Sequence, residues 1–332
     1  MIVRLLLMML LPLAAGCDTI AYYKQAIGGH LEIMSVARPV DDWLADPGTP
    51  AALRERLETA RRIRKFAAHR LGLPQNRSYT LYAELDRPFV VWNVFAAGEF
   101  SVQPRQECFP FTGCVGYRGF FSEQDARRHA ERLRSEGYDV YIGGVPAYST
   151  LGWFDDPLLS TFIRYPDAQL ARLVFHELAH QVVYARDDTT FNESFAVAVE
   201  EEGVRRWLDA EGRHGELEAF RAAQARRQQF ADKVKATRLR LAAVYAEKDV
   251  SKETLLSRKR EEFEKLRAEY PKIVPAEPNN AFLVSIALYT ELVPQFEQLL
   301  AESGSLEAFY EKVRELAKSG KRLKPPGPAA AR

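Results

Sequence analysis

The stretch Phe175-His176-Glu177-Leu178-Ala179-His180 decides how this chain is organised, and it lies inside a run from Pro166 to Tyr184 that predicts a helix. Residues four apart return to nearly the same helical face, so His176 and His180 can direct two imidazole nitrogens at one zinc ion. Glu177 lies beside that face, where its carboxylate can accept a proton from an attacking water. The pattern predicts a zinc site with hydrolytic chemistry. The alternative is a helix that merely happens to carry two histidines.

The same helix has the features of a buried element. Asp167 is placed to cap its first turn. Apolar residues recur at helical spacing and predict a face turned to the core; they are Leu170, Leu173, Val174, Leu178, Val182 and Val183.

A catalytic zinc site usually has three protein ligands, so the two histidines need a partner. After a polar turn at 186–190, a second helix begins near Phe191, and its Glu193 is the best candidate. Small residues at Ala196 and Ala198 would let the two helices approach closely. The alternative for Glu193 is an acid favoured by the helix dipole, and Asp187 or Asp188 remains open as the third ligand. Glu200, seven residues after Glu193, could orient a ligand histidine, although 200–202 also reads as a solvated acidic run.

The first residues read as an export signal rather than as part of the fold. Arg4 precedes an apolar run from Leu5 to Ala15, and small residues lead to Cys17. The pattern resembles a bacterial lipoprotein signal at 1–16, with Cys17 lipidated and anchoring the chain to a membrane. The alternative is an ordinary secretory signal with an incidental cysteine. Either predicts the periplasmic side of the cell envelope, and Asp18 favours the inner membrane.

Two further cysteines, Cys108 and Cys114, flank a short Pro/Gly-containing loop. In an oxidising compartment this favours a disulfide between them. Two metal-ligand thiols are the alternative.

Charge balance excludes some partners. Lys and Arg number 46 and Asp and Glu 45, giving a net charge of +1. We therefore expect no nucleic-acid partner. No further apolar run reaches membrane-spanning length, so the lipid should be the only anchor.

The rest of the chain predicts one domain at 17–322 and a disordered tail at 323–332. Its parts are a helical region (18–72), a sheet-containing region (78–150), the zinc helices (166–210), a long helical hairpin (211–270) and C-terminal helices (279–320).

Within the sheet region, Tyr79 to Leu85 and Phe89 to Phe95 read as a hairpin. A strand edge there could receive an extended peptide by backbone pairing, or the sheet could only support the zinc helix. The loop at 144–157 is a plausible wall of a substrate cleft.

Two later features have open interpretations. The hairpin at 211–270 is either a lid or partner-binding arm, or a solvated structural element. Tyr289, on an apolar helix at 281–291, could stabilise an oxyanion during catalysis, or it could be a core residue.

The sequence resembles a bacterial family of predicted aminopeptidases with a lipoprotein signal. The resemblance rests on His176-Glu-Leu-Ala-His180, Asn192-Glu-Ser-Phe-Ala196 with Glu200, the loop Pro146 to Pro157, the two cysteines and Asn279-Asn280-Ala281. It implies a zinc-dependent peptidase related to the gluzincins. We expect a mostly α-helical α+β zincin-like domain, with a small sheet packed on the HExxH helix, one Zn²⁺ and a peptide or protein substrate. An envelope endopeptidase and a zinc-stabilised binding lipoprotein without catalysis remain alternatives.

Overall fold

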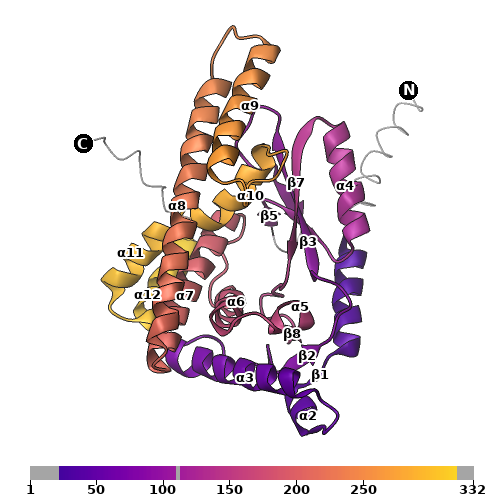
Figure 1. The fold of residues 1–332 in the computed structure, drawn as a ribbon, viewed down its shortest axis with the longest axis vertical. Helices are drawn as coiled ribbons and strands as arrows, with labels where there is room; N and C mark the ends of the chain where they lie inside the picture. The colour runs from indigo at the N-terminus through magenta and orange to yellow at the C-terminus, as the bar shows by residue number, and fades with distance from the viewer. Residues whose placement is uncertain (1–21, 110–112, 320–332) are drawn as a thin grey trace.

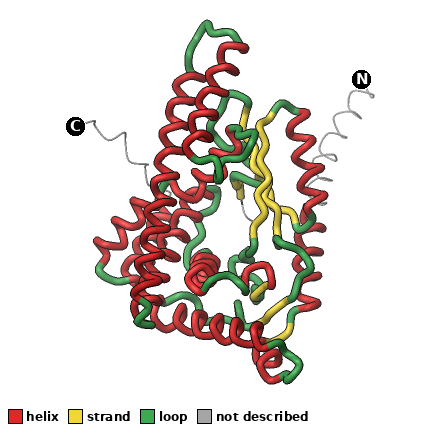
Figure 2. Tube along the Cα trace, viewed as in Figure 1, coloured by secondary structure: helices red, strands yellow, loops and turns green. Residues whose placement is uncertain are grey.

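The computed structural model describes residues 22–109 and 113–319. Helices surround a few short strands in these ranges, as Figures 1 and 2 show, so the prediction of a mostly α-helical α+β fold is confirmed. In the described ranges, no helix is both long and apolar enough to cross a membrane. The predicted signal at 1–16, Cys17, Asp18 and the tail at 323–332 lie outside the described residues.

The main sheet is antiparallel, with strand order β6-β3-β7. Trp92, Val94 and Ala96 face the helix α4, whereas Phe95 and Ala97 face α10 on the other side. Because both faces of β3 are covered, its sequence lacks the polar alternation of a half-exposed strand. The elements are β3 (Val91–Gly98), β6 (Arg118–Phe120), β7 (Tyr138–Val145), α4 (Glu123–Ser135) and α10 (Asn280–Thr290).

A second sheet has the order β1-β2-β8, formed by Arg38–Pro39, Leu81–Ala83 and Leu158–Leu159. The predicted hairpin between 79–85 and 89–95 is wrong, because β2 pairs with β1 and β8 while β3 pairs with β6 and β7. Aromatic and β-branched residues predict strands but do not choose their partners. This small sheet shares its core with the HExxH helix α6, through Tyr82 and Leu158 among others.

The central pair of helices is α6 (Asp167–Ala179) and α7 (Thr189–Ala210), with α3 (Ala51–Leu71) against both. Close packing depends on Gly203 of α7, where an added Cβ would lie 2.7 Å from the Phe175 ring and 2.9 Å from Leu71 Cδ1. The glycine lets α7 pack directly on α6.

The predicted start and end of α6 need correction. Asp167 does not cap the helix, because its carboxylate pairs with Arg56 and Arg213 instead. The helix also ends at Ala179 rather than near Tyr184, with His180 as its C-cap. After His180 the backbone makes the tighter bonds of a turn, from Gln181 N to Leu178 O at 3.1 Å and from Val182 N to Ala179 O at 2.9 Å.

The predicted helical hairpin is present as α8 (His214–Tyr245) and α9 (Lys252–Glu269), which extend beyond the sheet in Figure 1. Ser251 accepts a hydrogen bond from Thr254 N and so starts α9. Whether the hairpin binds a partner stays a prediction.

The remaining helices and strands complete the fold. A helix at 22–36 lies below α4 in Figure 1, and α11, which the sequence did not predict, precedes α12. The remaining bounds are α2 (Val40–Ala45), β4 (Glu107–Phe109), β5 (Gly113–Val115), α5 (Ser160–Ile163), α11 (Val293–Ser303) and α12 (Leu306–Ser319).

Candidate metal centre

A cavity of about 610 Å³ separates the main sheet from the paired helices α6 and α7. His176, Glu177, His180, Glu193 and Tyr289 all line it. The loop at 145–151 forms part of its wall, in the place expected for a cleft wall. The structure thus gathers the predicted site residues around one space.

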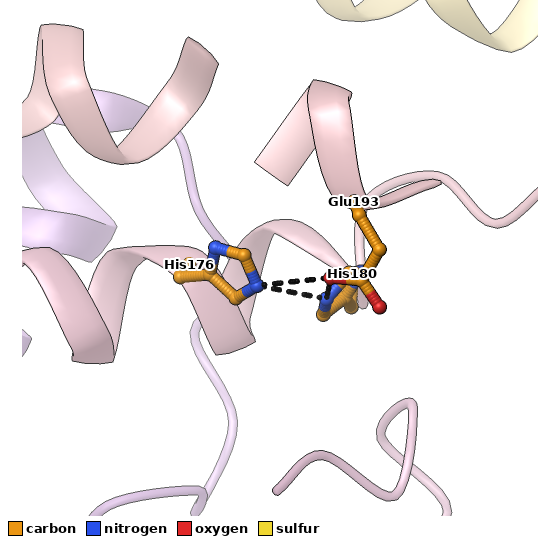
Figure 3. Close-up of side chains that lie close together, drawn as sticks. All are labelled: His176, His180 and Glu193. Carbon is orange, nitrogen blue, oxygen red and sulfur yellow. Dashed lines mark hydrogen bonds and ion pairs between the residues drawn. The ribbon is translucent and has the colours of Figure 1, made fainter. Parts of the chain in front are cut away.

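Three donor atoms converge at this wall. His176 Nε2 and His180 Nε2 are 3.2 Å apart, and Glu193 Oε2 lies 3.4 Å from the first and 3.5 Å from the second. Figure 3 shows both histidines on one helix and Glu193 reaching them from another. The cluster could hold a metal ion.

The spacing of the three atoms fits a small tetrahedral cation. Two ligand atoms that each lie about 2.0–2.1 Å from such an ion are about 3.3–3.4 Å apart, which is close to all three separations. Two imidazole nitrogens and one carboxylate oxygen are also a donor set of catalytic zinc sites. The residues therefore fit the ion that the HExxH pattern implies.

The turn between the helices explains why Glu193 reaches the histidines. The Asn192 side-chain amide accepts a hydrogen bond from Ala185 N at 2.7 Å and donates one to Ala185 O at 2.8 Å. Asp188 caps α7 by accepting from Phe191 N, and Asp187 accepts from Cys114 N. The two aspartates left open as third ligands therefore hold backbone amides instead.

Glu200 lies behind His176, on the side away from the other donors. Its Oε2 accepts a hydrogen bond from His176 Nδ1 at 2.8 Å, and its Oε1 accepts one from Arg172 at 2.9 Å. Once Nε2 loses its proton, as metal binding requires, a proton on Nδ1 leaves the lone pair of Nε2 directed at the cluster. This geometry is the one expected if Glu200 orients His176.

Opposing effects set the protonation of these buried groups. Burial tends to lower the pKa of His176, but hydrogen bonds to Glu193 and Glu200 outweigh it and raise the pKa to about 10. Burial tends to raise the pKa of Glu193, but His180 and His176 lower it to about 2. Burial raises the pKa of Glu177, an effect that the two histidines partly offset. Several carboxylates thus share one buried space, which favours a bound cation.

Tyr289 lies at the same wall, with its ring centroid 6.4 Å from that of His176. Its hydroxyl is hydrogen-bonded to Tyr117, and Tyr117 in turn donates to Glu193 Oε1 at 3.2 Å. Burial raises the pKa of both tyrosines well above the usual value, so both keep their hydroxyl protons.

Tyr117, Arg172 and Glu201 are among the residues that line the cavity and that sequence reasoning did not assign to it. Glu201 had been read as part of a solvated run, yet its side chain is only 11% exposed and pairs with Arg227. Its position eight residues after Glu193 is a helical spacing that could have indicated the shared face. Tyr117 follows a short strand, and no local pattern marks it.

The predicted disulfide joins Cys108 to Cys114 and closes the β4–β5 hairpin, so the metal-thiol alternative is wrong. Because Cys114 N donates to Asp187, this hairpin lies against the turn that positions α7.

The edge of the main sheet beside the cavity is already occupied. Gln25 donates to Gly119 O at 3.2 Å and accepts from Phe121 N at 3.1 Å. These are the outward backbone groups that an added strand at β6 would use. A substrate pairing there would have to displace the Gln25 amide.

The fold is that of a mostly helical α+β protein, and its cluster of His176, His180 and Glu193 could hold one metal ion. A family model described as "Putative aminopeptidase" matches residues 21–324, and the chain belongs to this family. The family's description indicates a peptidase. No similar protein was found among curated proteins or among solved structures.

Proposed function

We propose that the protein is a zinc-dependent aminopeptidase of the bacterial cell envelope. The observation that carries the proposal is the convergence of His176, His180 and Glu193 at a cavity that Glu177 also lines. Family membership supports peptide substrates.

His176, His180 and Glu193 would hold Zn²⁺. When bound, the ion would supply Lewis acidity that lowers the pKa of a water molecule and polarises a peptide carbonyl. Glu177 accepts a proton from the attacking water and later delivers it to the leaving amine. Burial raises the pKa of Glu177, which makes its carboxylate a stronger proton acceptor than an exposed one.

Tyr289 brings a hydroxyl group to the same wall, beside Tyr117, whose own proton is donated to Glu193. The developing oxyanion of a tetrahedral intermediate needs hydrogen-bond donors placed before the reaction. We assign this role to Tyr289, as the sequence suggested. Because Tyr117 donates its proton to Glu193, the Tyr289 hydroxyl would turn from Tyr117 to the oxyanion in order to donate to it.

The location in the envelope rests on the signal-like residues 1–16. We propose that lipid on Cys17 tethers the protein on the periplasmic side, with Asp18 favouring the inner membrane.

The first experiment is metal analysis of the purified protein with His176→Ala as the variant. We expect one zinc per chain in the wild type and a loss of zinc in the variant. The matched control is His69→Ala, which removes an exposed histidine on α3 and should leave the zinc content unchanged. Equal metal content in all three proteins would contradict the proposed ligands.

The second experiment maps the cleavage of a mixed peptide library by mass spectrometry. The zinc-loaded protein should remove single amino-terminal residues, and Glu177→Gln should abolish this, whereas Glu55→Gln on the exposed face of α3 should not. Internal cuts that depend on Glu177 would identify an endopeptidase. A zinc-loaded wild type without cleavage would favour the binding lipoprotein.

A further inference from the structure

Four exposed apolar side chains form a patch on the surface beside the cavity. Ile27, Leu31, Trp153 and Phe154 are 56%, 57%, 79% and 57% exposed. They are four of the seven large apolar residues that are strongly exposed within 22–109 and 113–319. Contiguous apolar surface of this kind marks an interaction site more often than a scattered residue does. We call these four residues the apolar patch.

The two segments that carry the patch are held together. Ile27 and Leu31 lie on one flank of the helix 22–36, and the buried His30 lies between them in sequence. The Phe154 ring contacts the His30 ring, with centroids 4.5 Å apart, and His30 Nδ1 is hydrogen-bonded to the Tyr148 hydroxyl at 2.7 Å. Phe154 therefore lies against the turn of the helix that carries Ile27 and Leu31, and Trp153 adjoins Phe154 in the sequence.

The loop is built to hold its aromatic residues outward. Asp156 accepts a hydrogen bond from Thr150 N at 3.0 Å, and Thr150 Oγ1 accepts one from Phe154 N at 3.1 Å. Between them, Leu151 and Gly152 have left-handed backbones with φ of 57° and 81°, a tight turn that directs the chain back. The patch is thus a preformed surface.

The proposed lipid on Cys17, a part of the proposed function on which this step rests, indicates what covers this surface. Only residues 18–21 separate Cys17 from Tyr22, so Cys17 lies within about 18 Å of the start of the helix, even if that segment is fully extended. Lys24 continues the stripe of Ile27 and Leu31 toward that end, and Arg77 beside Asp155 is 75% exposed. Arg77 is paired with Asp155, so Lys24 is the cation that flanks the apolar residues. Exposed tryptophan with apolar neighbours and a flanking lysine suits the interface of a lipid bilayer.

We propose that the apolar patch docks the protein on the surface of an anionic lipid bilayer. Trp153 and Phe154 enter the headgroup region together with Ile27 and Leu31, while Lys24 faces the phosphates. Tyr148, Ser149 and Leu151 of the same loop line the cavity, so docking places one wall of the cavity next to the membrane. The docking itself requires neither a bound metal nor the proposed peptidase activity.

The test uses residues 17–332 with Cys17→Ser, which lack only the leader and the lipid, and vesicles of phosphatidylethanolamine with phosphatidylglycerol. We expect this protein to sediment with the vesicles and its tryptophan fluorescence to shift to the blue. The shift reports on Trp153, because Trp92 and Trp207 are buried and Trp43 packs on Tyr82. Treatment with a chelator should leave binding unchanged, which separates this result from the fate of the proposed function.

Single substitutions locate the binding surface. Leu31→Ser and Trp153→Ser should each weaken vesicle binding about tenfold. The matched control is Leu239→Ser, because Leu239 on α8 has the same 57% exposure as Leu31. It should bind vesicles as the unchanged protein does.

Three outcomes would overturn the proposal. The first is that the protein does not bind vesicles. The second is that the patch substitutions and the control Leu239→Ser weaken vesicle binding equally. The third is that the patch substitutions abolish dimer formation or peptide binding while vesicle binding persists. The third would assign the patch to a protein partner.

Discussion

Glu200 is the residue on which the orientation of His176 depends. It is 3% exposed and bridges the imidazole to Arg172. Glu200→Ala should weaken zinc binding about 10- to 100-fold, because the ring loses the acceptor that fixes its tautomer and direction. Competition with a chromophoric chelator measures this affinity.

Glu202 provides the control for that substitution. It lies two residues further on α7 and pairs with Arg205 and Arg206 rather than with the cluster. Glu202→Ala should leave zinc affinity unchanged. An unchanged affinity in Glu200→Ala would show that the hydrogen bond to His176 does not support the metal site.

Asp156 makes folding stability depend on pH. Burial raises the pKa of its carboxyl from 3.8 to about 7, although hydrogen bonds from Thr150 oppose the shift. Between these values the unfolded chain releases the proton while the folded chain retains it, so this group's contribution to the free energy of unfolding falls as pH rises from about 4 to about 7.

Asp156→Asn should remove that contribution while keeping an oxygen that accepts from Thr150 N. We expect the variant to gain stability relative to the wild type as pH rises from about 4 to 7, by at most about 1.4 kcal/mol per pH unit. Urea unfolding at several pH values measures the difference. A constant difference across this range would contradict the assignment.

At the scale of the elements, the contact between α6 and α7 sets the geometry of the centre, and Gly203 permits it. Gly203→Ala would force a methyl group against Phe175 and Leu71, at a cost of about 1–3 kcal/mol. Urea unfolding should show this loss.

Gly215 offers a matched helical glycine. An added Cβ there meets nothing within 4 Å. Gly215→Ala should therefore be neutral or stabilise the protein by up to about 1 kcal/mol. Equal effects at both positions would show that helical propensity, not packing, decides the outcome.

At the scale of the whole molecule, a bound metal would join two helices that the chain connects only through a turn. An ion that binds the folded state alone at about 100 times its Kd stabilises by about 2.7 kcal/mol, which is about 4 °C or more for a chain of this size. Removing zinc with a chelator should lower the melting temperature by at least this amount.

Glu193→Ala separates metal loss from other effects of the chelator. Without this carboxylate the variant should melt at nearly the same temperature with and without chelator, measured by differential scanning calorimetry. A chelator effect as large as that on the wild type would place the metal elsewhere.

The candidate centre was largely predictable from local spacing. The i, i+4 relation of His176 and His180 follows from the backbone of any α-helix. The positions of Glu193 and Glu200 beside the histidines were predicted from the short turn between the two helices and from the seven-residue spacing of the glutamates on the second helix. The Ser251 cap of α9 is equally local, because a cap needs only its own next few residues.

Other features could not be predicted because their partners are distant in the chain. Tyr117 reaches Glu193 across 76 positions, and no pattern near either residue records the contact. The strand β2 shows the same problem, since its composition predicted a strand but its partners β1 and β8 were decided by packing.

The sequence by itself therefore determined the helical class, the face that carries the histidines and the glutamates placed to join them, because these depend on repeats of a few residues. Only the tertiary structure decided the pairing of strands, the tyrosines at the cavity and the apolar patch between the helix 22–36 and the loop at 148–156. Those features depend on which surfaces are buried together, and that choice is made by the packing of the whole chain.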